Sequence, residues 1–303
     1  MAKTDTPALL ALVFTILIWG VTSVFVRGVS LALGPSDALV VRLILAAMIF
    51  FVVLMFSTGF RMAIKDAVML AAISLIGLFG YFVFSIFGFA HAPAGIGTLI
   101  MSTQPMLIAM LASFVGSDRL YLQTIIGLLI SFAGSVLLVW GNGFGDGSAA
   151  GFEIALGCGL IFIAGAAWSI FVVFSRSLIQ TYGALKITGL SNIIIALPLL
   201  PLANTSLITK TMNLNNDAIF GLVFLSTLGA TASVVTWNYA AGKLRPSLLG
   251  SSLYILPIIA VVAGWAMLNE PITSNIVFAA IIILVGVGIS QWNPKAKNLR
   301  KAA

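Results

Sequence analysis

Residues 8–27 read ALLALVFTILIWGVTSVFVR, and residues 157–176 read GCGLIFIAGAAWSIFVVFSR. Each stretch is apolar over nearly its whole length and ends in an arginine. A helix needs about 20 apolar residues to cross the hydrocarbon core of a bilayer. Both stretches therefore predict transmembrane helices. Trp19 occupies the same place in the first as Trp168 does in the second, which indicates an internal repeat.

The composition of the whole chain also indicates a membrane protein. Of 303 residues, 61% are apolar and 8% are charged, whereas a soluble domain carries about 25% charged residues. So few ionic groups cannot cover a surface that faces water, and lipid must surround most of it. Apolar runs of similar length predict ten spans, near 8–27, 37–57, 67–88, 93–116, 121–141, 151–175, 184–203, 218–240, 247–268 and 273–292.

The lysines and arginines predict the orientation, because positive residues concentrate on the cytoplasmic side of a membrane. With the N-terminus inside, twelve of them fall on inner segments and three on outer ones, namely Arg27, Arg42 and Lys210. We therefore predict that both termini are cytoplasmic. The net charge of +7 is interpreted as a topology signal and a contact for membrane lipid rather than for nucleic acid.

A repeat is visible when the chain is compared with itself at offsets of 149 and 152 positions. The predicted halves are 1–145 and 151–303, which form one membrane domain. The glycine-rich segment 141–147 between them is interpreted as a linker, since it lacks the spacing and the preceding strand of a phosphate loop. The coinciding pairs are Trp19 and Trp168, Phe25 and Phe174, Arg27 and Arg176, Pro105 and Pro257, Asp118 and Glu270, Gly134 and Gly286, and Trp140 and Trp292.

Five spans in each half is an odd number, so the second half is expected to enter the membrane inverted. The predicted fold is an all-α integral membrane protein with ten transmembrane helices in two inverted five-helix repeats. Inverted repeats are typical of secondary transporters, which hold the substrate near the midplane between the repeats. A membrane-embedded enzyme and a non-transporting scaffold stay open as alternatives. Neither needs such symmetry.

Several motifs resemble the EamA-type branch of the drug/metabolite transporter superfamily. The resemblance implies a cavity lined by the third, fourth, eighth and ninth helices, with the first, second, sixth and seventh as gates. Known members export amino acids, drugs or metabolites, and the sequence is most similar to the aromatic amino-acid exporters. It departs from the pattern where Arg119 follows Asp118 and where Ser191 is the counterpart of Arg42. The motifs are Trp19-Gly20, Arg42, Pro105 and Gly134 in the first half, and Asn238 to Gly242, Leu256-Pro257, Asn269-Glu270-Pro271 and Gly286 in the second.

A stripe of small or polar residues runs along one face of the third span and along its counterpart, the eighth. Small residues allow close helix packing, which is the structural alternative to a cavity. Tyr81 and Trp237 fit packing less well, because each needs a partner for its polar atom at membrane depth. The candidate wall residues from these two spans are Tyr81, Ser85, Ser233 and Trp237.

The fourth and ninth spans each carry a proline, Pro105 and Pro257, near the middle. A proline frees the carbonyl four residues earlier, which must then face protein or water. The alternatives are a harmless kink and a helix hinge beside a cavity. The candidate wall residues on these spans are Thr98, Met101, Ser102, Ser251 and Tyr254.

The predicted gate consists of Trp19, Trp168 and Arg42. Arg42 is placed near the outer end of the second span, where it can reach the interface, pair with Asp37 or attract a substrate carboxylate. No acid is predicted at mid-span, and this absence favours facilitated, uniport-like passage. No lysine or arginine is predicted at mid-span either, which argues against phosphate-containing substrates.

A single histidine, His91, and a single cysteine, Cys158, leave no metal or cofactor site to predict. The aromatic and hydroxyl residues of the predicted cavity favour a small neutral or zwitterionic metabolite, an amino acid above all, as the substrate. We expect it to be exported across a bacterial inner membrane.

Overall fold

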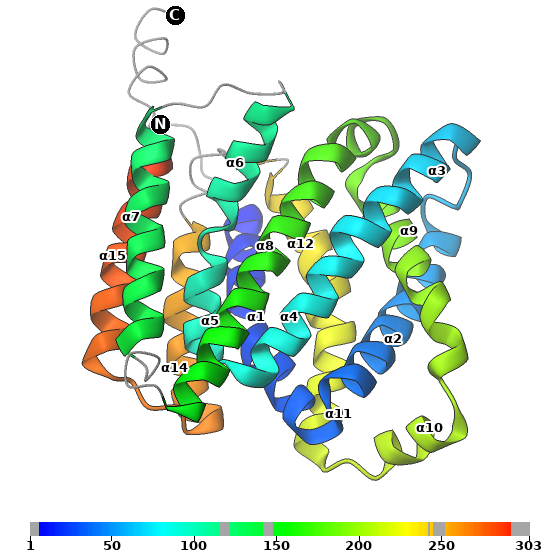
Figure 1. Cartoon of the computed structure of the whole chain (residues 1–303). Coiled ribbons are helices and arrows are strands. Elements are labelled where there is room, and N and C mark those ends of the chain that lie inside the picture. Colours follow the sequence, from blue (N-terminus) through cyan, green and yellow to red (C-terminus); the bar gives the residue numbers. More distant parts are fainter. Residues whose placement is uncertain (1–5, 116–121, 142–147, 242, 245–251, 292–303) are drawn as a thin grey trace, which may run out of the picture.

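The computed structural model describes residues 6–115, 122–141, 148–241, 243–244 and 252–291. Within these residues every regular element is a helix. Figure 1 shows the long helices running side by side in one bundle. An all-helical membrane fold is therefore confirmed at this level.

In the first half, a turn at Gly34 separates the first two helices. Its φ of 87° suits a residue without a side chain, and Pro35 then opens the next helix. The elements are α1 (Thr6–Leu33), α2 (Pro35–Phe56), α3 (Ile64–Ile73), the π-helix η1 (Ser74–Phe79), α4 (Gly80–His91), α5 (Ala94–Met101), α6 (Gln104–Phe114) and α7 (Leu122–Val139).

In the second half, Gly183 makes the corresponding turn with a φ of 85°, 149 positions after Gly34. The elements are α8 (Ala149–Tyr182), α9 (Ala184–Ala196), the 3-10 helix η3 (Leu197–Leu202), α10 (Thr205–Met212), α11 (Asn216–Ser226), the π-helix η4 (Leu228–Ala232), α12 (Ser233–Ala241), the 3-10 helix η5 (Leu253–Ile255), α14 (Leu256–Leu268) and α15 (Ser274–Gln291).

Seven helical stretches of the described chain are long and apolar enough to cross a membrane. They coincide with the predicted first to fourth and sixth to eighth spans. The other three predicted spans fall on shorter apolar helices, Ile125–Val139, Leu256–Leu268 and Ser274–Ile289. Large apolar side chains such as Leu10, Phe56 and Phe114 are exposed on the outside of the bundle, as lipid-facing residues are.

Helices of one half pack against helices of the other. α1 packs against α12 and α14, and α8 packs against α4 and α6. α2 lies against α9, and α7 lies against α15, the latter pair at one edge of the bundle (Figure 1). The largest core cluster therefore draws its buried residues, such as Phe89 and Ile161, from both halves.

The contact between α7 and α15 is reciprocal. A Cβ atom on Gly134 would lie 2.8 Å from Ile283 Cγ1, and one on Gly286 would lie 2.5 Å from Ser131 Oγ. The Ser131 hydroxyl also donates to the Ile283 carbonyl at 2.9 Å. Gly286 is 152 positions after Gly134, and Ile283 is 152 positions after Ser131. The repeat offset therefore converts one contact into the other. Residue numbers rise along α7 while those of their partners fall along α15, so the helices are antiparallel.

Candidate substrate site

Two aromatic contacts join the halves. The Trp19 ring on α1 lies 5.1 Å from the Trp237 ring on α12, centroid to centroid. The Tyr81 ring on α4 lies 5.1 Å from the Trp168 ring on α8. In each case the first helix of one half meets the third span of the other. The four rings are only partly buried, so each keeps an accessible face or edge.

The Tyr81 contact belongs to a longer row of rings. Tyr81 also touches Phe82, with centroids 5.3 Å apart, and Trp168 touches Phe171 at 5.7 Å. Among the described residues, neither the Tyr81 hydroxyl nor the Trp237 indole N–H has a hydrogen-bond partner. Aromatic polar groups at such depth usually have one, so both groups are available to water or a substrate.

Four of the predicted wall hydroxyls donate to carbonyls three or four residues earlier in the chain. Ser85 donates to the Phe82 carbonyl at 3.2 Å, and Ser233 donates to the Gly229 carbonyl at 2.8 Å. Thr98 and Ser102 likewise donate to carbonyls four residues earlier. A hydroxyl that donates in this way can still accept a hydrogen bond. These hydroxyls therefore have hydrogen-bond partners even when no substrate is bound.

The third span of each half, that is the third and the eighth span of the chain, is interrupted by a π-helix. The sequence did not predict these interruptions. η1 begins at Ser74 and η4 at Leu228, 154 positions later. π-helical turns inside α-helices occur frequently at functional sites. Each interruption lies directly before the helix that carries Tyr81 or Trp237, so it sets the orientation of that ring.

The fourth and ninth spans are also interrupted, next to the predicted hinge prolines. α5 ends at Met101, two turn residues follow, and Pro105 lies at the start of α6. In the second half, η5 precedes α14, and Pro257 is the second residue of α14.

Not every predicted wall residue can be placed. Met101 and Ser102 are half-buried. Ser251 lies outside the described residues, as does the side chain of Tyr254. So do Asp118 and residues 142–147 of the predicted linker.

Polar contacts between helices near the tryptophan pair were missed by the sequence analysis. The Thr15 and Thr236 hydroxyls lie 2.7 Å apart and join α1 to α12. Thr15 precedes Trp19 by one helical turn, and Thr236 precedes Trp237 directly. A threonine one turn from a tryptophan on an otherwise apolar helix was the available signal.

A second reciprocal contact joins the halves, between η1 and α9 on one side and between α11 and α2 on the other. The Ser74 hydroxyl donates to the Ser191 hydroxyl at 2.9 Å, and the Ser226 hydroxyl lies 3.5 Å from the Arg42 carbonyl. Ser226 is 152 positions after Ser74, and Ser191 is 149 positions after Arg42. The two contacts are thus counterparts under the offsets of the sequence repeat.

Arg42 lies deeper than its place in the predicted span implied. α2 runs from residue 35 to 56, so Arg42 is only about 5 Å along the axis from the helix midpoint, at about 1.5 Å per residue. Its side chain is buried, with 7% exposed. The depth of Arg42 in the membrane, and the absence of a cation at mid-span, stay predictions. A charge at the centre of a membrane-spanning helix costs about 2.5–3.5 kcal/mol on insertion scales, and less toward the interface.

A partly buried ion pair, also missed, joins α1 to the end of α14. Arg27 Nε lies 3.0 Å from Glu270 Oε1, and Arg27 also donates to the Phe89 and Ala92 carbonyls at the end of α4. Glu270 Oε1 in turn accepts the Ala94 amide at the start of α5 at 2.9 Å. Glu270 therefore has a structural role here, since it pairs with Arg27 and accepts a hydrogen bond from the first amide of α5.

Two further ion pairs of the described chain lie at the same end of the bundle, where Figure 1 shows the start of α8, α10 and the turn after α14. Lys210 Nζ contacts Asp37 Oδ2 at 2.9 Å, and His91 contacts the Glu153 carboxylate. All three pairs link the first half to the second. Together, Arg27–Glu270, Lys210–Asp37 and His91–Glu153 are called the ion-pair ring below.

The other carboxylates of the described residues also stand at helix ends. Asp66, at the start of α3, accepts the Tyr182 hydroxyl at 2.7 Å at the opposite end of the bundle. Asp217 lies in the first turn of α11. Among the described residues no three His, Cys, Asp or Glu side chains converge.

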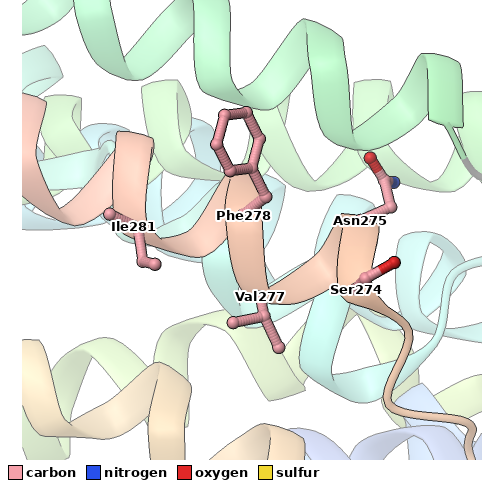
Figure 2. A pocket seen from close by; sticks show the side chains of 5 residues that line it. All are labelled: Ser274, Asn275, Val277, Phe278 and Ile281. Atoms are coloured by element: carbon pink, nitrogen blue, oxygen red, sulfur yellow. The ribbon is translucent and has the colours of Figure 1, made fainter.

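Two hollows among the described residues lie away from the aromatic pairs. One, of about 790 Å³, is an open groove along α15 lined by Ser274, Asn275, Val277, Phe278 and Ile281. Figure 2 shows Asn275 and Phe278 pointing to one side of α15 and Val277 to the other. Its exposed apolar side chains are those of a lipid-facing helix. The other, of about 120 Å³, lies beside Glu270 and Gly95.

Comparison with known proteins agrees with this arrangement. The EamA-like transporter family matches the chain twice, over residues 6–140 and 155–291. An uncharacterized transporter of Archaeoglobus fulgidus is 24% identical and covers 92% of this chain and 97% of its own length. The uncharacterized transporter YyaM of Bacillus subtilis is 26% identical over 84% and 83%.

A probable terminal-alkyne amino-acid exporter of Streptantibioticus cattleyicolor is 22% identical over 68% of this chain and 67% of its own. One solved crystal structure, 20% identical, matches 95% of this chain and 98% of its own with a TM-score of 0.63, which shows a shared fold.

The helical bundle and the twofold family match define an integral, multi-pass membrane transporter. The chain belongs to the EamA-like transporter family, and the relatives above are named as transporters.

Proposed function

We propose that this protein is a secondary transporter that exports small neutral or zwitterionic metabolites, amino acids including aromatic ones, by alternating access. The observation that carries the proposal is the pair of cross-half aromatic contacts, Trp19 with Trp237 and Tyr81 with Trp168. Rings with accessible faces and unbonded polar atoms, held between the two halves, suit a compact substrate with an apolar side group.

We assign ten spans in two inverted halves, 1–145 and 151–303, with both termini cytoplasmic. Three observations support this architecture. The family matches each half separately, the α7–α15 contact is reciprocal and antiparallel, and α7 and α15 have 18 residues each, about 27 Å of helix. η5 and α14 together have a similar length. That length approaches the hydrocarbon thickness of about 30 Å.

The proposed pocket lies at mid-depth, between the π-helical spans and the proline-containing spans. Trp19, Arg42 and Trp168 are the proposed gate, and Pro105 and Pro257 are the proposed hinges. The ion-pair ring supports closure of the predicted outer end in this conformation, because each pair ties one half to the other. The proposed wall consists of Tyr81, Ser85, Thr98, Met101, Ser102, Ser233, Trp237, Ser251 and Tyr254.

The amino-acid substrate class and the bacterial inner membrane are parts of this proposal. The name of the Streptantibioticus relative, an amino-acid exporter, supports the substrate class, and bacterial relatives support the location. The described carboxylates all stand at helix ends. The described residues thus include no membrane-embedded carboxylate of the kind that proton-driven transporters usually carry, which supports passage down the substrate gradient.

The test is flux of radiolabelled amino acids into liposomes that contain the purified protein. We expect aromatic amino acids to move down their own gradients with no imposed pH step. Flux that requires a pH step and stops with an ionophore would refute facilitated passage. Absence of flux for every amino acid would refute the substrate class.

The pocket is tested by Trp237→Ala. Loss of one aromatic contact, about 1–2 kcal/mol, lowers the apparent affinity about five- to thirtyfold. The control is Phe132→Ala on α7, since the Phe132 side chain is 53% exposed on the outside of the bundle. Normal transport by Trp237→Ala, with loss in Phe132→Ala, would place the pocket on other helices.

A further inference from the structure

Arg42 is a buried cation for which the described residues provide no counter-charge. It is 7% exposed, and it lies about a third of the way along α2. The Arg42 guanidinium carbon stands 4.8 Å from the centre of the Phe82 ring on α4. A cation–π contact of this kind stabilises a guanidinium without neutralising it.

No carboxylate of the described residues pairs with Arg42. Asp37, the acid on its own helix, is bound by Lys210 at 2.9 Å, and Glu270 and Glu153 are bound by Arg27 and His91. Among these residues the guanidinium also makes no hydrogen bond. The titratable group near enough to act on it is the Tyr81 hydroxyl.

Packing does not require an arginine at this position. The counterpart in the second half is Ser191, which is also buried and is bonded to Ser74. A serine thus fills the equivalent buried position in the second half. A charge on only one side of a pseudo-symmetric pocket points instead to a ligand that is itself asymmetric.

The row of rings beside Arg42 supplies the other half of a binding site. Phe82 touches Tyr81, and Tyr81 touches Trp168. A carboxylate bound at the guanidinium would have its apolar side group within reach of these rings. The planar guanidinium binds both oxygens of a carboxylate at once.

We infer that Arg42 binds the carboxylate of the transported molecule, and that the rings of Tyr81 and Trp168 receive its side group. The substrate class is then an amino acid, or another small organic acid with an apolar side group, and not the corresponding amide or amine. This inference rests on the proposed transport function and names the group by which that function selects its substrate.

The test compares L-phenylalanine with L-phenylalaninamide, which differ at the carboxylate, in liposomes that contain the purified protein. We expect the wild type to prefer the acid by about ten- to hundredfold in apparent affinity. Arg42→Gln should weaken uptake of the acid by that factor and leave uptake of the amide nearly unchanged. Arg42→Lys, which keeps the charge but not the fork, should lie between.

The matched control is Arg61→Gln, because Arg61 is an exposed cation on the loop between α2 and α3, and it should transport like the wild type. Equal uptake of acid and amide by the wild type would overturn the inference without any variant, and so would an unchanged preference in Arg42→Gln. Uptake of neither compound, and of no other amino acid, would instead refute the proposed function on which the inference rests.

Discussion

At the residue scale, two glycines of α8 lie two positions apart and have different surroundings. A Cβ atom on Gly157 would lie 2.7 Å from the Ala92 amide nitrogen and 2.8 Å from the Gly88 carbonyl. A Cβ atom on Gly159 would meet nothing within 4 Å. Backbone atoms cannot rotate aside, so close approach of α8 to the end of α4 depends on Gly157.

We therefore expect Gly157→Ala to lower the unfolding free energy by about 1–3 kcal/mol. Gly159→Ala should be neutral or stabilising by up to about 1 kcal/mol, because alanine favours the helix. Thermal unfolding of the purified protein in detergent measures both. Equal unfolding temperatures for the two variants would show that the helices do not approach as described.

The ion-pair ring gives a second prediction at the residue scale. Glu270→Gln leaves Arg27 partly buried without its counter-charge, so we expect a loss of about 3 kcal/mol or more in stability. Glu153→Gln is the comparison. The Glu153 side chain is 53% exposed, and an exposed pair contributes about 0–1 kcal/mol. A larger loss in Glu153→Gln than in Glu270→Gln, again by thermal unfolding, would contradict this ranking.

At the scale of the elements, alternating access requires the ion-pair ring to open. Asp37 at the start of α2 and Lys210 on α10 stand in contact between the halves. Replacing both by cysteine and joining them with a short, cleavable thiol crosslinker should stop flux in liposomes, and a reductant should restore it. The wild type is the control, since its cysteine, Cys158, is buried. Undiminished flux in the crosslinked protein would show that this end does not open.

The sequence predicted the positions of the apolar helices well but not their interruptions. Hydropathy depends on composition, so it located the seven long helical stretches and the shorter apolar ones. It could not reveal the π-helices η1 and η4, because a widened turn has no compositional signature. Nor did it predict the short helix α10, which begins after the Asn204 cap in a stretch interpreted as a loop.

The candidate site was predictable only in part. Spacing along a helix pointed to Tyr81 and Trp237, and the structure places an aromatic partner beside each. Helical spacing could not show that Trp168 and Trp19 are the partners of these rings, because contacts between the halves depend on how the helices pack in the bundle. Arg42 lies two residues farther into its helix than the predicted span implied, because α2 begins at Pro35, before the predicted start near 37.

At the scale of the whole molecule, the two halves meet through contacts that exchange under the sequence repeat. Gly134 and Gly286 occupy matching places between α7 and α15, and the Ser74–Ser191 bond has its counterpart at Ser226 and Arg42. A two-fold axis in the membrane plane produces such exchanges in a protein whose second half is inverted. These exchanges support the proposed arrangement of two inverted halves around a shared pocket.

Membrane topology tests this central claim most directly. A reporter fused after Ala303, and the same reporter inserted at Gly145 between the halves, are read for cytoplasmic or external location in intact cells. Five spans on either side of the insertion place the reporter after Ala303 in the cytoplasm and the one at Gly145 outside. Both reporters on the same side of the membrane would contradict the inverted arrangement.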